Sequence, residues 1–138
     1  MTNRTITPSV EEFLASEPNL ILATLRKDAG PQLSPVWFLW RDDMFIISTT
    51  ITTAKWRNLK RDQRCSGIID NPNGKYIYVS GVAELSVEEV PLPITTAIVH
   101  KYKTPEEFNP YMEVVHGRGD PRGIIQLKPE RIVTRELV

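Results

Sequence analysis

Cysteine, histidine and long apolar runs are scarce in this sequence, and each shortage excludes a class of protein. Cys65 is the single cysteine, so no disulfide forms within the chain and a cysteine-rich zinc site is excluded. His100 and His116 are the two histidines and lack the spacing of a metal motif, which favours surface or packing roles. No apolar run approaches the roughly 20 residues that span a bilayer, so we expect a cytoplasmic protein with no membrane partner.

Neither sign of charge is in excess. The chain has 17 Lys and Arg against 17 Asp and Glu, which gives a formal net charge of zero. This balance excludes a bulk electrostatic attraction to nucleic acid or to an anionic membrane, so we expect a small-molecule substrate and no nucleic acid. The length of 138 residues fits one domain over residues 1–138, and eleven prolines argue against a bundle of long helices.

Apolar runs separated by turn residues predict a largely β structure. Three runs follow one another with tight turns between them, which is typical of an antiparallel meander and not of βαβ units. The expected strands cover residues 20–25, 32–40, 44–49, 65–70, 76–85, 123–128 and 131–137, with a break at Pro129. So many antiparallel strands in a short chain favour a small barrel, because closure removes exposed edges.

Capping patterns predict short helices between these strands, so the expected class is mostly β with short helices (α+β). Ser9, Ser86 and Thr104 are each followed three residues later by Glu, which is the pattern of a capping box. The expected helices run from Ser9 to near Pro18, over residues 54–61, over residues 94–102 and from Thr104 onward.

The segment 36–40 is apolar at every position, which a strand with one solvent-exposed face would not be. One face of this expected strand fills the barrel. The other face meets either helices of the same chain or a second subunit. The sequence leaves both alternatives open.

The strongest indication of chemistry is a run of hydroxyl side chains that leads into a helix start. Ser48 and Thr49 end a strand, Thr50 comes directly after it, Thr52 and Thr53 follow as possible N-caps, and two cations come next. A helix N-terminus offers unpaired N–H groups and a positive dipole end, so this pattern predicts a phosphate site. Simple N-capping with solvated cations is the plainer alternative.

Two cations of this helix differ in their suitability as phosphate ligands. Lys55 and Arg57 are two residues apart and therefore point to different sides of a helix. Lys55 is nearer the helix start and is the better candidate.

The order and spacing of several short segments resemble one protein family. The chain reads ATLRKDAGPQLSPVWF at residues 23–38, STT at 48–50, AKWRNLKRD at 54–62 and VSGVAEL at 79–85. These segments resemble the pyridoxamine 5'-phosphate oxidase-like split-barrel family. Within it, they are similar to the flavin-reductase-like branch that uses coenzyme F-420, an 8-hydroxy-5-deazaflavin.

The resemblance implies an antiparallel split β-barrel and a homodimer with cofactor sites at the subunit interface. It implies that the cofactor ring lies against Gln32, Ser34, Pro35, Val36, Trp37 and Ile47. It implies that the phosphate lies near Ser48, Thr49, Thr50, Lys55 and Arg57.

The activity implied is that of an oxidoreductase that transfers a hydride to a small unsaturated or quinone-like acceptor. In such enzymes the cofactor performs the redox step, so no side chain of the protein is expected to act as a catalytic residue. Two alternatives keep the fold: an oxidoreductase that binds flavin mononucleotide (FMN), and a non-catalytic module that binds a flavin or haem. A cluster of cations beyond Lys55, made of Arg57, Lys60, Arg61 and Arg64, favours the long anionic tail of F-420.

Overall fold

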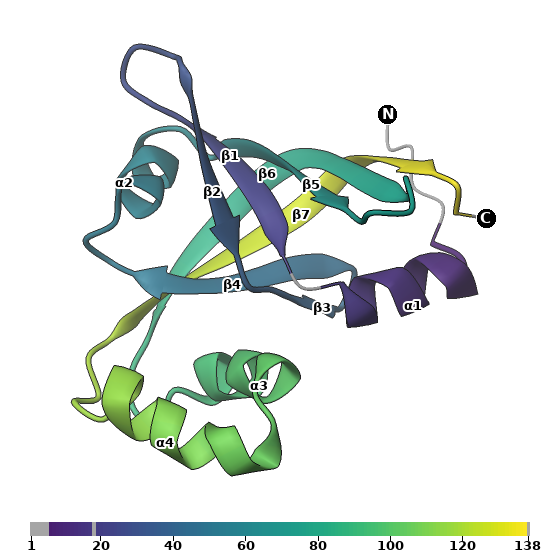
Figure 1. The fold of residues 1–138 in the computed structure, drawn as a ribbon. Coiled ribbons are helices and arrows are strands. Elements are labelled where there is room, and N and C mark those ends of the chain that lie inside the picture. Colours follow the sequence, from purple (N-terminus) through teal and green to yellow (C-terminus); the bar gives the residue numbers. More distant parts are fainter. Residues whose placement is uncertain (1–5, 18, 138) are drawn as a thin grey trace.

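The computed structural model describes residues 6–17 and 19–137, which form one antiparallel sheet with four helices around it (Figure 1). The strands are β1 (Leu20–Leu25), β2 (Pro31–Val36), β3 (Leu39–Arg41), β4 (Met44–Thr50), β5 (Arg64–Asp70), β6 (Tyr76–Glu88) and β7 (Arg122–Arg135). The helices are α1 (Pro8–Ser16), α2 (Ala54–Arg61), α3 (Pro93–Tyr102) and α4 (Pro105–His116). The expected class, a mostly β split barrel with short helices, is confirmed.

The sheet has the strand order β2-β1-β5-β6-β7-β4-β3, so its two edge strands are consecutive in the chain. Trp37 and Phe38 alone separate β2 from β3, which brings the two edges of the sheet close to one another. Side chains that alternate along the strands fill the inside, where Leu22, Ile47 and Val79 are fully buried. Helix α1 covers one end of this core with Val10, Phe13 and Leu14.

The prediction of one strand over residues 32–40 is wrong, because Trp37 and Phe38 leave the ladder. The Phe38 N–H donates to the Tyr102 hydroxyl over 3.0 Å, and its carbonyl accepts from Lys101 Nζ over 3.0 Å. The Phe38 ring is fully buried, and Trp37 stacks on Tyr102. Side chains of α3 thus cover this apolar segment, which removes the sequence argument for a partner subunit at residues 36–40.

Two of the three expected capping boxes are wrong. Helix α1 begins at Pro8, and Thr7 caps it by accepting from the Val10 N–H, because proline suits the first helical position better than a cap. Ser86 lies inside β6, which pairs with β7 as far as Glu88. The box at Thr104 is confirmed with both of its hydrogen bonds. Helix α1 ends at Ser16, and Pro18 lies outside the described residues.

The break expected at Pro129 is a bulge within one long strand. β7 pairs with β6 on both sides of Pro129, and the register shifts between Ser80 and Gly81. A Cβ at Gly81 would lie 2.0 Å from the carbonyl oxygen of Lys128, so the two strands approach too closely there for any other residue. The proline therefore interrupts the ladder without ending the strand.

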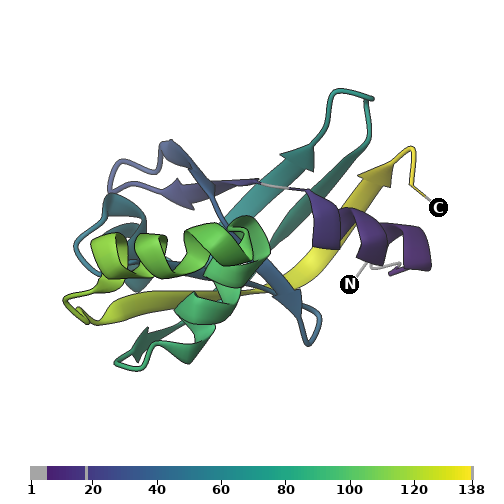
Figure 2. The same ribbon diagram turned by 60° about the horizontal axis from the view of Figure 1, so that its bottom comes forward.

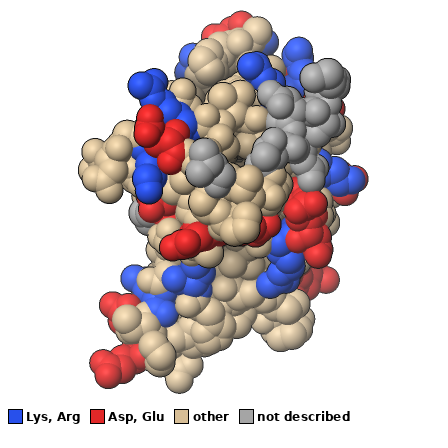
Figure 3. Space-filling model, turned by 90° about the vertical axis from the view of Figure 1, so that its right-hand side faces the viewer, with Lys and Arg blue, Asp and Glu red and all other residues tan. Residues whose placement is uncertain are grey.

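Helices α3 and α4 lie together on one side of the barrel, beyond β4 (Figures 1 and 2). None of the described helices is both long enough and apolar enough to cross a membrane. Cations and anions are interspersed over the face that Figure 3 shows, in keeping with the zero net charge.

Candidate functional site

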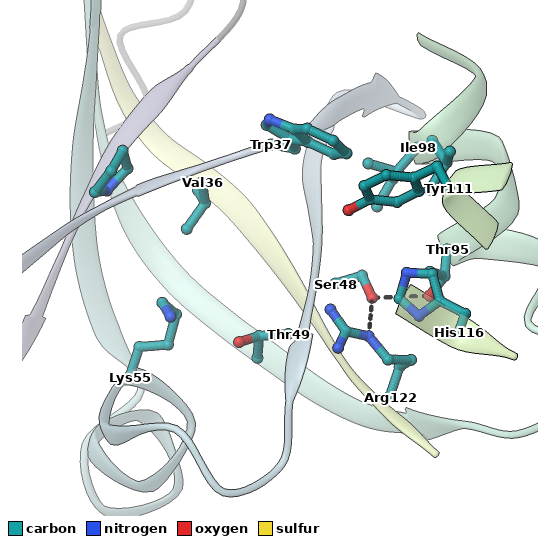
Figure 4. A pocket seen from close by; sticks show the side chains of 12 residues that line it. Val36, Trp37, Ser48, Thr49, Lys55, Thr95, Ile98, Tyr111, His116 and Arg122 are labelled. Carbon is teal, nitrogen blue, oxygen red and sulfur yellow. Dashed lines mark hydrogen bonds between the residues drawn. The ribbon is translucent and has the colours of Figure 1, made fainter. Parts of the chain in front are cut away.

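A cavity of about 250 Å³ opens where β2 and β4 meet α2 on one side and the α3–α4 pair on the other (Figure 4). Its lining residues are Pro35, Val36, Trp37, Ser48, Thr49, Lys55, Thr95, Ile98, Val99, Tyr111, His116 and Arg122. Figure 4 shows Lys55 and Arg122 on opposite sides of this cavity, with Thr49 between them. The cavity therefore has two cationic ends.

Lys55 occupies the first turn of α2, whose position the core fixes. Trp56 is buried against β7, where Gly123 leaves room for it: a Cβ at Gly123 would lie 2.6 Å from the indole ring. Asn58 is buried too and donates to Thr24 Oγ1 over 3.1 Å and to Gln32 Oε1 over 2.7 Å. These contacts hold the start of α2 at the cavity.

The Lys55 ammonium is half-buried and forms no ion pair with any carboxylate of the described residues. Burial lowers the pKa of Lys55, and repulsion by the Arg122 charge lowers it further. An anion that enters the cavity would stabilise the charged form of this lysine, because the anion offsets both effects.

Arg122 begins β7 and is held by hydroxyl groups, with no carboxylate of the described residues in ion-pair contact. Its Nε donates to Ser48 Oγ and its Nη1 to Thr50 Oγ1, each over 3.0 Å. Burial lowers the pKa of the guanidinium. Arg122 has five N–H donors, and the three that remain have no hydrogen-bond acceptor within the part of the chain that the structure describes.

A chain of hydrogen bonds runs from Arg122 to the buried carboxylate of Glu88, and its direction follows from its two ends. Ser48 Oγ and Thr95 Oγ1 are 2.7 Å apart, and Thr95 Oγ1 donates to Glu88 Oε1 over 2.8 Å. Since arginine only donates and a carboxylate only accepts, Ser48 accepts from Arg122 and donates to Thr95. The hydroxyl hydrogen of Ser48 is thus directed away from the cavity.

Glu88 lies at the N-terminus of α3 and does not line the cavity. Its carboxylate accepts from the N–H groups of Ile94 over 2.6 Å and Thr95 over 2.9 Å. These bonds and the positive end of the helix dipole stabilise its charge.

Aromatic side chains form the wall next to α3 and α4. Trp37 stacks on Tyr102 with 4.5 Å between ring centroids and lies 5.6 Å from Tyr111. The Tyr111 hydroxyl points into the cavity (Figure 4). Burial, and after it the Arg122 charge, lowers the pKa of His116.

The structure brings six of the residues implied by the resemblance into one cavity and places five elsewhere. Pro35, Val36, Trp37, Ser48, Thr49 and Lys55 line the cavity. Gln32 accepts a hydrogen bond from Asn58, Ile47 lies in the core, and Thr50 accepts a hydrogen bond from Arg122. Arg57 is exposed and donates to the Thr52 carbonyl. Ser34 of β2 pairs with Leu22 of β1. The described residues hold no cluster of three or more His, Cys, Asp or Glu side chains suited to a metal ion.

The lining residues that sequence reasoning missed come from α3, α4 and β7. They are Thr95, Ile98, Val99, Tyr111, His116 and Arg122. These positions follow the hydroxyl run by about half the chain, and no local pattern marks them. The pairing of β4 with β7, which sets Thr50 opposite Arg122, brings Arg122 to the hydroxyl run, and the bond between Ser48 and Thr95 joins α3 to it.

The fold agrees with comparisons to known proteins. The family model described as pyridoxamine 5'-phosphate oxidase matches residues 6–135. The chain belongs to this family.

Solved structures of the same fold have diverse descriptions. A conserved hypothetical protein from Mycobacterium tuberculosis is 21% identical with a TM-score of 0.73, and the match covers 97% of this chain and 89% of that one. An F-420 reductase is 23% identical with a TM-score of 0.71, covering 93% and 98%. A haem-binding protein from Mycobacterium smegmatis is 20% identical with a TM-score of 0.64, covering 96% and 55%. At these identities the likeness establishes the fold.

Proposed function

We propose that this protein is an oxidoreductase that binds the deazaflavin coenzyme F-420 and transfers a hydride to a small unsaturated or quinone-like acceptor. The observation that carries the proposal is Lys55, a half-buried cation without a carboxylate partner among the described residues. It stands at the N-terminal turn of α2 and faces a cavity with an aromatic wall. A helix N-terminus with a cation in its first turn is a typical binding site for a phosphate group.

The residues present fit a flat cofactor that carries a phosphate. Lys55 and the first turn of α2 would hold the phosphate, with Thr49 beside them. Val36 and Trp37 would exclude water from one side of the ring. When bound, the cofactor supplies the hydride, and the protein contributes position and a dry wall.

Cations beyond Lys55 favour F-420 over FMN, because the deazaflavin continues into a polyglutamyl tail with several carboxylates. Arg57 and Lys60 are exposed on α2, and Arg61 reaches back to the Leu25 carbonyl over 2.8 Å. Arg64 is paired with Asp62, which offsets its charge. The tail would therefore depend on the three α2 cations more than on Arg64.

FMN and haem are the competing ligands. FMN ends in one phosphate, which Lys55 and the α2 N-terminus would satisfy without further cations. Haem is favoured by one observation, the imidazole of His116 in the cavity wall, since imidazole nitrogen is a common iron ligand. Each ligand absorbs visible light differently, so the spectrum of the purified protein distinguishes them.

A homodimer with the cofactor site next to its interface is part of the proposal, and the outer face of the sheet is its natural contact surface. Register partners on that face form two rows: Pro35, Ile21, Ile68, Tyr78 and Val133, and beside them Leu33, Ala23, Ser66, Ser80 and Arg131. Nine of these ten side chains are uncharged, and Leu33 is 65% exposed. Pro35 also lines the cavity, so a partner on this face would lie beside the site.

The test is an absorption spectrum of the protein as purified, followed by titration with F-420, FMN and haem. Lys55→Ala should weaken cofactor binding by about 1.5–3 kcal/mol, the scale of a charged hydrogen bond. Arg57→Ala should weaken it less, because Arg57 bonds the Thr52 carbonyl and does not line the cavity. Equal cofactor affinity in Lys55→Ala and the parent protein would overturn the proposal.

A further inference from the structure

The cavity has a second cationic end that the cofactor phosphate does not require. We propose that Arg122 binds the carboxylate of the substrate, so that the acceptor is an organic anion with a flat, apolar body. This inference rests on the proposed function, since it assigns the Lys55 end to the cofactor and the Arg122 end to the substrate. The two ends lie on opposite sides of the cavity (Figure 4).

The donors at the Arg122 end suit a carboxylate. Two of the five N–H groups of the guanidinium bond Ser48 and Thr50, and three remain without an acceptor among the described residues. The Tyr111 hydroxyl points into the same space and has no hydrogen-bond partner within residues 6–17 and 19–137. A guanidinium with free N–H groups binds a planar carboxylate through parallel hydrogen bonds, which gives it direction as well as strength.

The hydrogen-bond chain to Glu88 fixes Arg122 in this orientation, and the Glu88 charge acts on the guanidinium without a direct ion pair. Ser48 and Thr95 carry the chain, and no carboxylate of the described residues pairs directly with the guanidinium. The Glu88 charge is stabilised by the N-terminal N–H groups of α3. Thr95 is therefore a positioning residue that acts through Ser48, and Arg122 stays free to bind an anion.

The apolar body of the ligand would lie against the wall on the α3–α4 side of the cavity (Figure 4). Trp37, Ile98 and Tyr111 line this part of the cavity. His116 adds a polar edge to this wall. A small conjugated acid fits such a mixture better than a sugar or a metal complex, because flat apolar rings bury well against aromatic side chains.

The test measures the binding of benzoate, inorganic phosphate and neutral benzamide by calorimetry, with the protein free and loaded with F-420 or FMN. Arg122→Gln should weaken benzoate binding at least about tenfold, the scale of one charge-assisted contact. Arg135→Gln removes the same charge from an exposed position at the far end of β7, and it should change benzoate affinity by less than about twofold. Lys55→Gln should weaken the binding of phosphate more than the binding of benzoate. Benzamide should bind the parent protein more weakly than benzoate does.

A second pair of variants tests the positioning of Arg122. Thr95→Val keeps the shape of this buried side chain and removes its hydroxyl, which breaks the chain to Glu88. Thr95→Ser keeps the hydroxyl. Benzoate affinity should fall several-fold in Thr95→Val and recover in Thr95→Ser. Loss in both variants would assign Thr95 a packing role alone and would overturn this part of the inference.

The outcomes separate this inference from the proposed function. Arg122-dependent benzoate binding in a protein that binds neither F-420 nor FMN would support the anion subsite and overturn the cofactor. Cofactor binding together with benzoate affinity that Arg122→Gln leaves unchanged, or with no benzoate binding, would overturn the subsite alone. If Arg122→Gln weakened cofactor binding as much as Lys55→Gln did, and benzoate did not bind in competition with the cofactor, Arg122 would belong to the cofactor site. That result would also overturn the inference.

Discussion

Lys55 and Arg122 face one cavity from opposite sides, and neither pairs with a carboxylate of the described residues. Two cations that share a small, partly buried space repel one another: burial lowers the pKa of Lys55, and the Arg122 charge lowers it further. Such an arrangement costs stability unless an anion binds there. The proposed cofactor phosphate and substrate carboxylate would each offset this cost.

The coupling of the two cations predicts a measurable shift in protonation. Arg122→Gln should raise the pKa of Lys55, because it removes the repulsion between the two cations. Burial is the larger cause of the lowered pKa and stays in place, so the pKa should remain below its usual value. NMR titration of isotopically methylated lysines would follow the Lys55 signal. Arg135→Gln should leave the Lys55 pKa unchanged, and an equal shift in both variants would show a general charge effect instead of a local one.

Lys101 predicts a pH dependence of stability. Its ammonium donates to the carbonyls of Leu14 and Phe38, and burial lowers its pKa to about 8. In the unfolded chain a lysine titrates near pH 10.4. Between these values the unfolded state binds more protons, so this group's contribution to the free energy of unfolding rises with pH. The difference in the free energy of unfolding between the parent protein and Lys101→Met, measured with urea from pH 7.5 to 10.5, should rise with pH, and parallel profiles would contradict the assignment.

Gly123 predicts a link between packing and the site. A Cβ at this position would meet the Trp56 ring at 2.6 Å, so Gly123→Ala should displace Trp56 and the first turn of α2. We expect a loss of about 1–3 kcal/mol in the free energy of unfolding and weaker phosphate binding at Lys55. Gly74→Ala in the β5–β6 turn is the control, since nothing lies within 4 Å of the added carbon and the cost there comes from the backbone alone.

The outer face of the sheet predicts the dimer contact. Ile68→Glu places a charge in the middle of one uncharged row and should yield a monomer by light scattering at micromolar concentration. Val114→Glu is the control, because Val114 is 85% exposed on α4, away from that face. A monomeric parent protein, or a dimer that survives Ile68→Glu, would contradict the proposed interface.

Much of the fold was predictable because it rests on local patterns. The apolar run of β1, the turn before β2 and the helix that follows Thr53 agree with the structure. The segment 36–40 misled the prediction because its two faces are covered by Tyr102 and Lys101, which lie more than sixty residues later. No periodicity within a short segment reveals such a contact.

The candidate site was half predictable for the same reason. Lys55 and the hydroxyl run are marked by a helix start, which is a local feature. Arg122 is marked by nothing local, and it reaches the site through the pairing of β7 with β4. Ser48 was expected to bind phosphate. Its hydroxyl donates to Thr95 instead, a bond that becomes evident only from the chain of hydrogen bonds between Arg122 and Glu88.

The central claim is that this cavity binds F-420 in preference to FMN. The most direct test compares the two dissociation constants at physiological ionic strength, with F-420 of different tail lengths and with added salt. The account predicts that F-420 binds more tightly, that its affinity rises with tail length, and that salt weakens it more than it weakens FMN, because exposed pairs of roughly 0–1 kcal/mol each are screened. Tighter binding of FMN, or no effect of tail length, would contradict it.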